Sequence, residues 1–187
     1  TKALSKIDVT SPDEDAKTIF YTSLYHTELE PTINSDVDGR YRTMDNKIEK
    51  DENYTNYTVF SLWDTFRAQH PLQTIINPSL NQRMISSLIH KYEEGGILPM
   101  WELASNYTGT MIGYHSVSVI VDAYMKGDRN FDIDKAYEAC VHSSGYDTTK
   151  LTSTIDRHIL EHNLIPIGKR YKNELGYIPS DKDNESV

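Results

Sequence analysis

An all-α fold is predicted for this chain of 187 residues by two features of its sequence. Apolar side chains recur at the 3.6-residue spacing of amphipathic helices in about six segments, and few stretches alternate between polar and apolar residues as half-buried strands do. Pairs such as Ser-Pro, Asn-Pro and Gly-Gly, which start or stop helices, separate these segments. The sequence therefore predicts an array of helices joined by loops.

The first helix is predicted after Ser11 and Pro12, because serine caps helices and proline suits the first helical position. Glu14, three residues after the serine, completes a capping pattern. An apolar stripe at helical spacing then runs to Leu24, and the helix should end before Pro31.

A long connection is predicted at residues 33–57, where short polar side chains alternate with larger ones. Asp38-Gly39 within it is a pair typical of tight turns. We expect one small β-hairpin or a long loop here, and long excursions between helices often carry function.

Five further helices are predicted after this connection. Their approximate bounds are 59–76, 80–94, 109–125, 132–141 and 148–162. Pro71 should bend or interrupt the first of them, and Gly95-Gly96 should end the second. The third has apolar residues on several sides, which predicts a buried helix that stops at Gly127.

The order of these helices indicates a larger architecture. Aromatic-rich helices with long loops alternate with more polar ones, which predicts an inner and an outer layer. Such hairpins would close into an (α/α)6 toroid only if more helices follow. The chain begins at Thr1, and residues 178–187 are typical of a loop that ends in polar helix-start residues with no helix after them. We therefore expect residues 1–187 to be one segment of a domain, truncated at both ends.

Composition limits the possible partners. The formal charge is −9 and no run of Lys or Arg is present, which argues against nucleic acid or an anionic membrane as a partner. No apolar run approaches the roughly 20 residues that cross a bilayer. Cys140 is the only cysteine, so no disulfide can form within the chain, and packing is its expected role. A neutral or cationic ligand, or a metal ion, fits this composition better.

Two neighbouring segments combine acids, arginines and aromatic residues. They are residues 34–45 and 57–67. Such a mixture suits a sugar, whose hydroxyl groups bind carboxylates and guanidinium groups and whose C–H face packs on an aromatic ring. Trp63 beside Asp64 supplies both kinds of group.

Three strings in the chain together resemble the family 92 glycoside hydrolases, which are calcium-dependent, exo-acting α-mannosidases. The strings are residues 35–42 (SDVDGRYR), 60–67 (FSLWDTFR) and 98–103 (LPMWEL), and residues 111–115 and 176–179 extend the similarity. The resemblance covers essentially the whole chain. It implies an (α/α)6 catalytic domain that removes terminal mannose from α-mannosides, such as N-glycan or mannan chains, with inversion.

The resemblance also implies what this segment lacks. In the family, the acid lies in a Glu-Gly-Asn-Ala-Trp string and the base in a later aspartate-rich loop, and neither occurs here. A histidine–glutamate pair associated with leaving-sugar recognition and the calcium site is also missing. We therefore expect no catalytic residue and no metal ligand in this segment. Calcium should bind elsewhere in the parent protein, and the segment alone should be inactive.

Six residues are predicted to bind substrate. They are Trp63, Asp64, Trp101, Glu102, Asp36 and Arg40. The resemblance places the Trp63–Asp64 pair at the subsite for the terminal sugar. Glu102 stands among apolar neighbours, where burial without a partner would be costly, and this favours a pocket role.

Each of these predictions has a structural alternative. Asp64 could cap a helix and pair with Arg67, and Trp63 could fill the space between helices. Asp38 is expected to serve only a turn. For His115, a role as a core histidine with its hydrogen bonds made inside the protein is favoured over a functional role as a ligand.

Other functions remain open from the residues alone. A non-catalytic carbohydrate-binding or scaffold module could use the same helices, and another enzyme with an α/α toroid is a third possibility. The expected partners are mannose-containing glycans and the remainder of the chain's own catalytic domain, with no nucleic acid and no membrane span. The resemblance implies a bacterial enzyme that is secreted or periplasmic.

Overall fold

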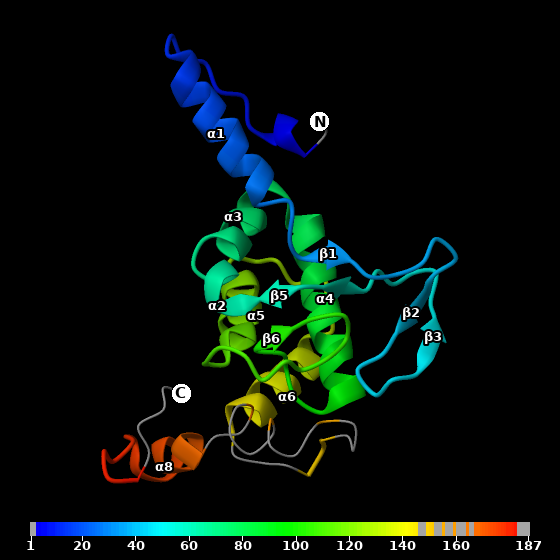
Figure 1. Ribbon diagram of the computed structural model, residues 1–187, viewed down its shortest axis with the longest axis vertical. Helices are drawn as coiled ribbons and strands as arrows, with labels where there is room; N and C mark the ends of the chain where they lie inside the picture. Colours follow the sequence, from blue (N-terminus) through cyan, green and yellow to red (C-terminus); the bar gives the residue numbers. More distant parts are fainter. Residues whose placement is uncertain are drawn as a thin grey trace.

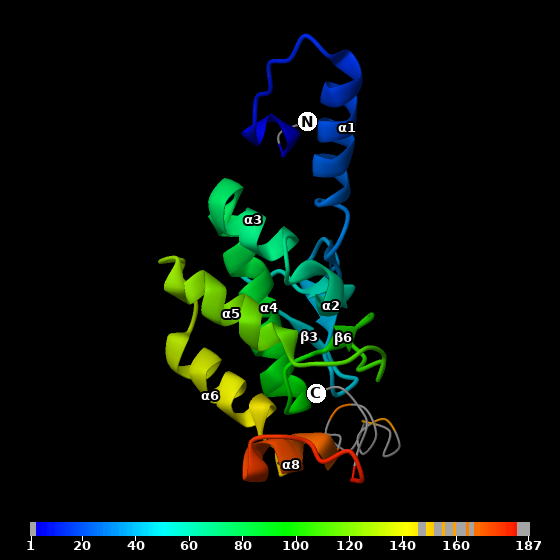
Figure 2. The ribbon, with the colours of Figure 1, turned by 90° about the vertical axis from the view of Figure 1, so that its left-hand side faces the viewer.

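Packed helices form the centre of the molecule (Figures 1 and 2). The computed structural model describes residues 3–145, 149–151, 155, 159, 164 and 167–182. Helices α4 (Pro78–Gly95), α5 (His115–Met125) and α6 (Ile133–Ser144) pack on one another, and α3 (Gln69–Ile76) packs on α4 and α5. Their shared core is apolar, and its wholly buried members include Phe60, Leu62, Ile85, Leu88 and Ala123.

The first helix stands away from this centre. Helix α1 (Glu14–His26) follows the short helix η1 (Leu4–Lys6) and projects from one end of the molecule (Figure 1). Its cap is Asp13, whose side chain accepts a hydrogen bond from the Ala16 amide at 3.0 Å. The prediction that Ser11 caps this helix is wrong, because the Ser11 hydroxyl accepts from the Asp13 amide instead.

The connection at residues 33–57 contains the predicted hairpin. Strands β2 (Arg40–Arg42) and β3 (Ile48–Lys50) pair antiparallel, with Tyr41 opposite Glu49. Strands β1 (Thr32–Ile33) and β4 (Tyr57–Thr58) form a second antiparallel pair. Asp38-Gly39 makes the predicted tight turn, but this turn precedes β2 and does not join the two strands.

The helix predicted for residues 59–76 is divided into three elements. Strand β5 (Phe60–Ser61) pairs with β6 (Trp101–Glu102), and helices α2 (Leu62–Thr65) and α3 follow. Val59, with a φ of 64°, has a left-handed backbone and so cannot be part of a right-handed helix. Pro71 does not break α3, because it lies in the first turn, where its missing N–H is not needed.

The ends of the later helices agree with the sequence in part. Helix α4 begins at Pro78 and ends at Gly95, where Gly96 takes the left-handed conformation with a φ of 90°. Helix α5 starts six residues later than predicted, because Gly109, Met111 and Gly113 all have positive φ. The predicted helix 148–162 falls mainly outside the described residues, and α8 (Ile167–Leu175) follows it.

No helix within the described ranges has the length and hydrophobicity needed to span a membrane.

Replacing Asp132 by alanine should lower the free energy of unfolding by about 1 kcal/mol. The Asp132 side chain caps α6 by accepting a hydrogen bond from the Lys135 amide at 2.9 Å. Chemical denaturation measures the change. Asp134→Ala, in the same first turn but without a capping hydrogen bond, is the control and should cost less; equal losses would contradict the cap.

Candidate functional site

Three of the predicted residues lie at or beside the pair of strands β5 and β6, at one edge of the helical centre. They are Trp63, Asp64 and Trp101. Ser61 lies opposite Trp101, and Phe60 lies opposite Glu102. Because neighbouring residues of a strand face opposite ways, Phe60 and Glu102 point into the core, where both are 0% exposed. Ser61 and Trp101 stay half-buried. Helix α2 starts directly after Ser61 and presents Trp63 and Asp64 beside them.

Asp64 is exposed and held in place by its neighbour. The Ser61 hydroxyl donates a hydrogen bond to Asp64 Oδ2 at 2.5 Å. No ion pair links Asp64 to any lysine, arginine or histidine that the structure describes. The alternative that Arg67 neutralises Asp64 is therefore not the arrangement observed. An oriented carboxylate without a cation is suited to accept hydrogen bonds from a ligand's hydroxyl groups.

Arg67 covers Trp63 instead. Its guanidinium carbon lies 4.5 Å from the centroid of the Trp63 ring and 5.2 Å from that of Phe66. His115 stacks on the Phe66 ring, with 4.1 Å between the ring centroids and an interplanar angle of 8°. The centroid of the His115 ring also lies 5.3 Å from that of Trp63. We call Trp63, Phe66, Arg67 and His115 the aromatic cluster.

The surroundings of His115 in this cluster disfavour its charged form. Burial, and then the nearby charge of Arg67, lower the pKa of the His115 imidazole. The ring is half-buried at the start of α5, and its Nε2 atom accepts or donates no hydrogen bond among the described residues. His115 is thus not the fully hydrogen-bonded core histidine that the sequence favoured. Its described contacts are with the aromatic rings of Trp63 and Phe66.

Gly113 leaves room for that imidazole. A Cβ atom at Gly113 would lie 2.5 Å from His115 Nε2, and the residue has a φ of 81°. Gly113→Ala should therefore lower the free energy of unfolding by about 1–3 kcal/mol through a strained backbone and a displaced ring.

Gly127→Ala is the matched control for this substitution, because Gly127 has a φ of 89° but no atom within 4 Å of the added Cβ. Chemical denaturation of both variants separates backbone strain from the steric clash. Gly113→Ala should be the less stable of the two, and equal stabilities would show that the His115 ring moves without cost.

Glu102 lies inside the molecule, not at the surface beside Asp64. Its Oε1 atom lies 3.2 Å from Lys91 Nζ, and both side chains are at most 1% exposed. The Thr58 hydroxyl donates to the same oxygen at 3.1 Å. The sequence was right that a carboxylate here needs a partner, and the partner is a lysine of α4. The structure does not bring Glu102 to the surface edge with Trp63.

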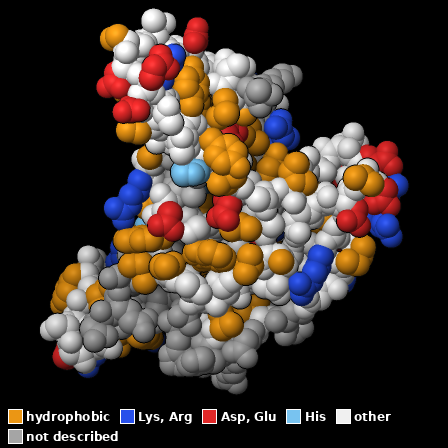
Figure 3. Space-filling model, turned by 45° about the horizontal axis from the view of Figure 1, so that its top comes forward, with side chains coloured by type: hydrophobic (Ala, Val, Ile, Leu, Met, Phe, Trp, Pro, Cys, Tyr) orange, Lys and Arg blue, Asp and Glu red, His pale blue; other side chains and the backbone are white. Residues whose placement is uncertain are grey.

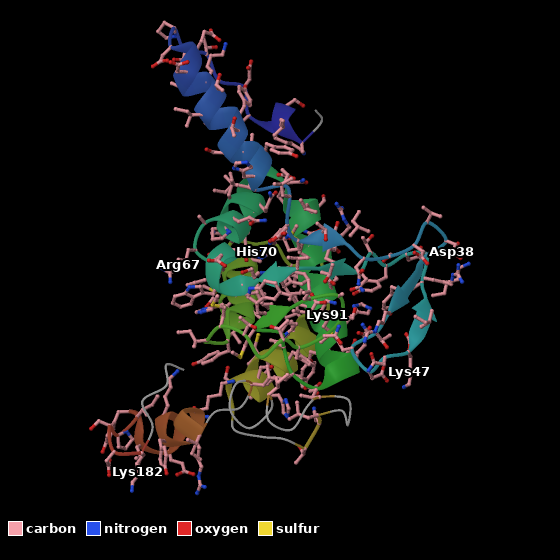
Figure 4. All side chains as sticks on the ribbon, in the orientation of Figure 1. Asp38, Lys47, Arg67, His70, Lys91 and Lys182 are labelled. Atoms are coloured by element: carbon pink, nitrogen blue, oxygen red, sulfur yellow. The ribbon has the colours of Figure 1, made fainter. Side chains whose placement is uncertain are left out.

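Asp36 and Arg40 belong to another part of the surface. Both are exposed on or beside β2, and Arg40 Nε pairs with Asp38 at 2.8 Å. Figure 4 shows Asp38 and Lys47 on the hairpin at one side of the molecule and Arg67 at the opposite side. In Figure 3 the hairpin is a projecting lobe that carries acidic and basic side chains together. The structure therefore separates Asp36 and Arg40 from the Trp63–Asp64 edge.

Sequence reasoning missed two features of the site. Arg67 stands four residues after Trp63, a spacing that places side chains together on helical backbone, so its contact with the indole could have been predicted. The stacking of His115 on Phe66 depends on how α5 packs against α2 and α3, which no local pattern reveals.

The acidic residues of the described chain do not assemble a metal site. No three side chains of Asp, Glu, His or Cys within the described ranges come together as ligands for a cation. The described residues therefore present no ligand set for a calcium ion.

Comparison with known proteins places this geometry in a family. The model of the glycosyl hydrolase family 92 catalytic domain matches residues 1–187. No curated protein matches the chain. A solved structure of the family GH92 α-mannosidase BT3965 from Bacteroides thetaiotaomicron, in complex with mannoimidazole, is 39% identical, with a TM-score of 0.81. The match covers 99% of this chain and 22% of that one.

A second relative agrees. The family GH92 inverting mannosidase BT2199 from the same species is 32% identical over 96% of this chain and 23% of its own, with a TM-score of 0.79. This chain thus spans less than a quarter of the length of either relative. The chain belongs to glycoside hydrolase family 92, and its described helices are part of that family's catalytic domain.

Proposed function

We propose that this chain is the first portion of the catalytic domain of an inverting α-mannosidase and supplies walls of its substrate site. The observation that carries the proposal is the exposed Asp64, which is held by Ser61 and pairs with no described cation. Trp63 precedes it in the chain, and Trp101 lies opposite Ser61 in the β5–β6 pair. A relative's structure holds mannoimidazole, and another relative is an inverting mannosidase, which supports the sugar class and the stereochemistry.

In this proposal the residues of the chain bind and orient the sugar. Asp64 accepts hydrogen bonds from neighbouring hydroxyl groups, and the indoles of Trp63 and Trp101 border the site and limit access of water. Inversion needs an acid and a base about 6.5–9.5 Å apart on opposite sides of the sugar. Both are proposed to lie elsewhere in the complete (α/α)6 toroid, so the isolated segment is proposed to be inactive.

Calcium, a secreted or periplasmic location in a bacterium, and N-glycans or mannan as substrates complete the proposal. A bound calcium ion would supply positive charge near the sugar's hydroxyl groups. The described residues hold no ligand set for this ion.

Proton NMR of a longer protein that contains this chain tests the proposed activity. The protein acts on an α-mannose-terminated disaccharide, first with calcium and then after chelation. We expect β-mannose to appear first and its release to stop on chelation. Initial α-mannose would overturn inversion, and activity that survives exhaustive chelation would overturn the calcium requirement.

The same experiment addresses the alternative of a non-catalytic carbohydrate-binding or scaffold module. In that alternative the complete protein lacks the acid and the base as well. Binding of the disaccharide without any mannose release across the common α-linkages would support it against the enzyme.

A further inference from the structure

We propose that Arg67 binds the sugar directly and selects its hydroxyl pattern together with Asp64. This inference rests on the function proposed above and assigns to Arg67 a sugar-binding role that was not predicted from the sequence. Three properties of Arg67 carry it: it has no polar partner among the described residues, aromatic rings hold its position, and it lies beside a carboxylate.

The guanidinium of Arg67 has no polar partner in the described part of the chain. The side chain is exposed, and no hydrogen bond or ion pair joins it to any described residue. By contrast, Arg40, Arg42 and Arg170 each pair with a carboxylate or an amide oxygen. A guanidinium group carries five N–H donors in a rigid plane. No described residue of the chain accepts a hydrogen bond from any of them.

The position of that group is fixed by aromatic rings. The guanidinium carbon lies 4.5 Å from the Trp63 ring and 5.2 Å from Phe66, and His115 supports Phe66 by stacking at 4.1 Å. Such cation–π contacts favour one orientation of an otherwise mobile side chain. Because the guanidinium covers a face of the indole, a sugar at this edge meets Arg67 where it would otherwise stack on that face of Trp63.

Asp64 and Arg67 lie on one side of the same turn. They are three residues apart, and the backbone remains helical through Phe66, so their side chains project to neighbouring positions. They nevertheless do not form an ion pair, since the carboxylate is held by Ser61 and the guanidinium by Trp63. A hydroxyl group both donates and accepts, so adjacent hydroxyls of one sugar can bind a carboxylate and a guanidinium together. This pairing recognises the spacing and orientation of the two hydroxyls.

The test measures sugar binding by variants of the complete protein that contains this chain. Isothermal titration of methyl α-mannoside, and of its four monodeoxy analogues, is carried out on the wild type, Arg67→Met and Arg67→Lys. The matched control is Arg129→Met, because Arg129 is also exposed and its guanidinium lies 4.3 Å from the Tyr124 ring, in the part of the chain after α5.

We expect Arg67→Met to weaken binding of methyl α-mannoside by about 10- to 100-fold, the range for a lost hydrogen bond to a charged group. Arg67→Lys should restore part of the affinity, because it keeps the charge but not the planar donors. One deoxy analogue should bind wild type and Arg67→Met equally weakly, an effect that a merely structural role for Arg67 would not produce. Arg129→Met should bind as the wild type does.

The outcomes separate this inference from the function on which it rests. If the wild type binds methyl α-mannoside and Arg67→Met binds every analogue as the wild type does, Arg67 does not contact the sugar. If Arg67→Met weakens all five sugars by the same factor, its role is structural and the inference is also overturned. If the wild type binds none of them, the proposed mannoside site itself is wrong.

Discussion

Replacing Lys91 by methionine is expected to lower the free energy of unfolding by about 3–5 kcal/mol, because it leaves the buried Glu102 carboxylate without its cation. Lys91 Nζ lies 3.2 Å from Glu102 Oε1, and the two side chains are 1% and 0% exposed. Burial lowers the pKa of the Lys91 ammonium, and the charge of Glu102 opposes that effect. Each charge is therefore stable in this interior only while the other is present.

Chemical denaturation of three variants tests this explanation. Lys91→Met and Glu102→Gln each remove one charge, whereas the double substitution removes both and should recover part of the loss. Lys126→Met is the surface control, since the exposed Lys126–Asp122 pair at 2.6 Å should contribute at most about 1 kcal/mol. A double variant as unstable as the sum of the two single ones would show that the charges do not depend on each other.

Only one side of this ion pair could be predicted from the sequence. The apolar neighbours of Glu102 favoured a pocket role, because a carboxylate buried without a partner would be costly; in the structure Glu102 is buried and its partner is Lys91. The identity of that partner could not be predicted, because Lys91 reaches Glu102 only through the packing of α4 against the β5–β6 pair. Tertiary contacts of this kind leave no periodic pattern in the chain.

The helices and strands also divide into those set by local sequence and those set by tertiary contacts. The end of α4 was predictable because Gly95-Gly96 acts within one turn, and α6 begins within one residue of its predicted start but ends three residues later than predicted. The replacement of a predicted helix by β5 and α2 was not predictable, because it depends on the left-handed Val59 and on pairing with residues about 40 positions later. In the candidate site, Trp63 and Asp64 are sequence neighbours, whereas Trp101 joins them only through that pairing.

Asp64→Asn should reduce the kcat/KM of the complete enzyme on an α-mannoside by about 100-fold or more, equivalent to about 3 kcal/mol of lost transition-state stabilisation. Asparagine keeps the size of the side chain and one acceptor oxygen, but it removes the charge that strengthens hydrogen bonds from sugar hydroxyls. Because Asp64 is exposed and takes part in no described ion pair, the free energy of unfolding should change by no more than about 0.5 kcal/mol.

The combination of a large kinetic effect with a small effect on stability is what identifies a binding carboxylate. Asp122→Asn is the control, because Asp122 is an acid on α5 whose partner is the surface residue Lys126. Steady-state kinetics and chemical denaturation are measured on both variants. If Asp64→Asn loses stability in proportion to its activity, Asp64 serves only to hold Ser61 and the start of α2. If it retains both, the sugar does not bind at this edge, and the exposed acids of the hairpin become the next candidates.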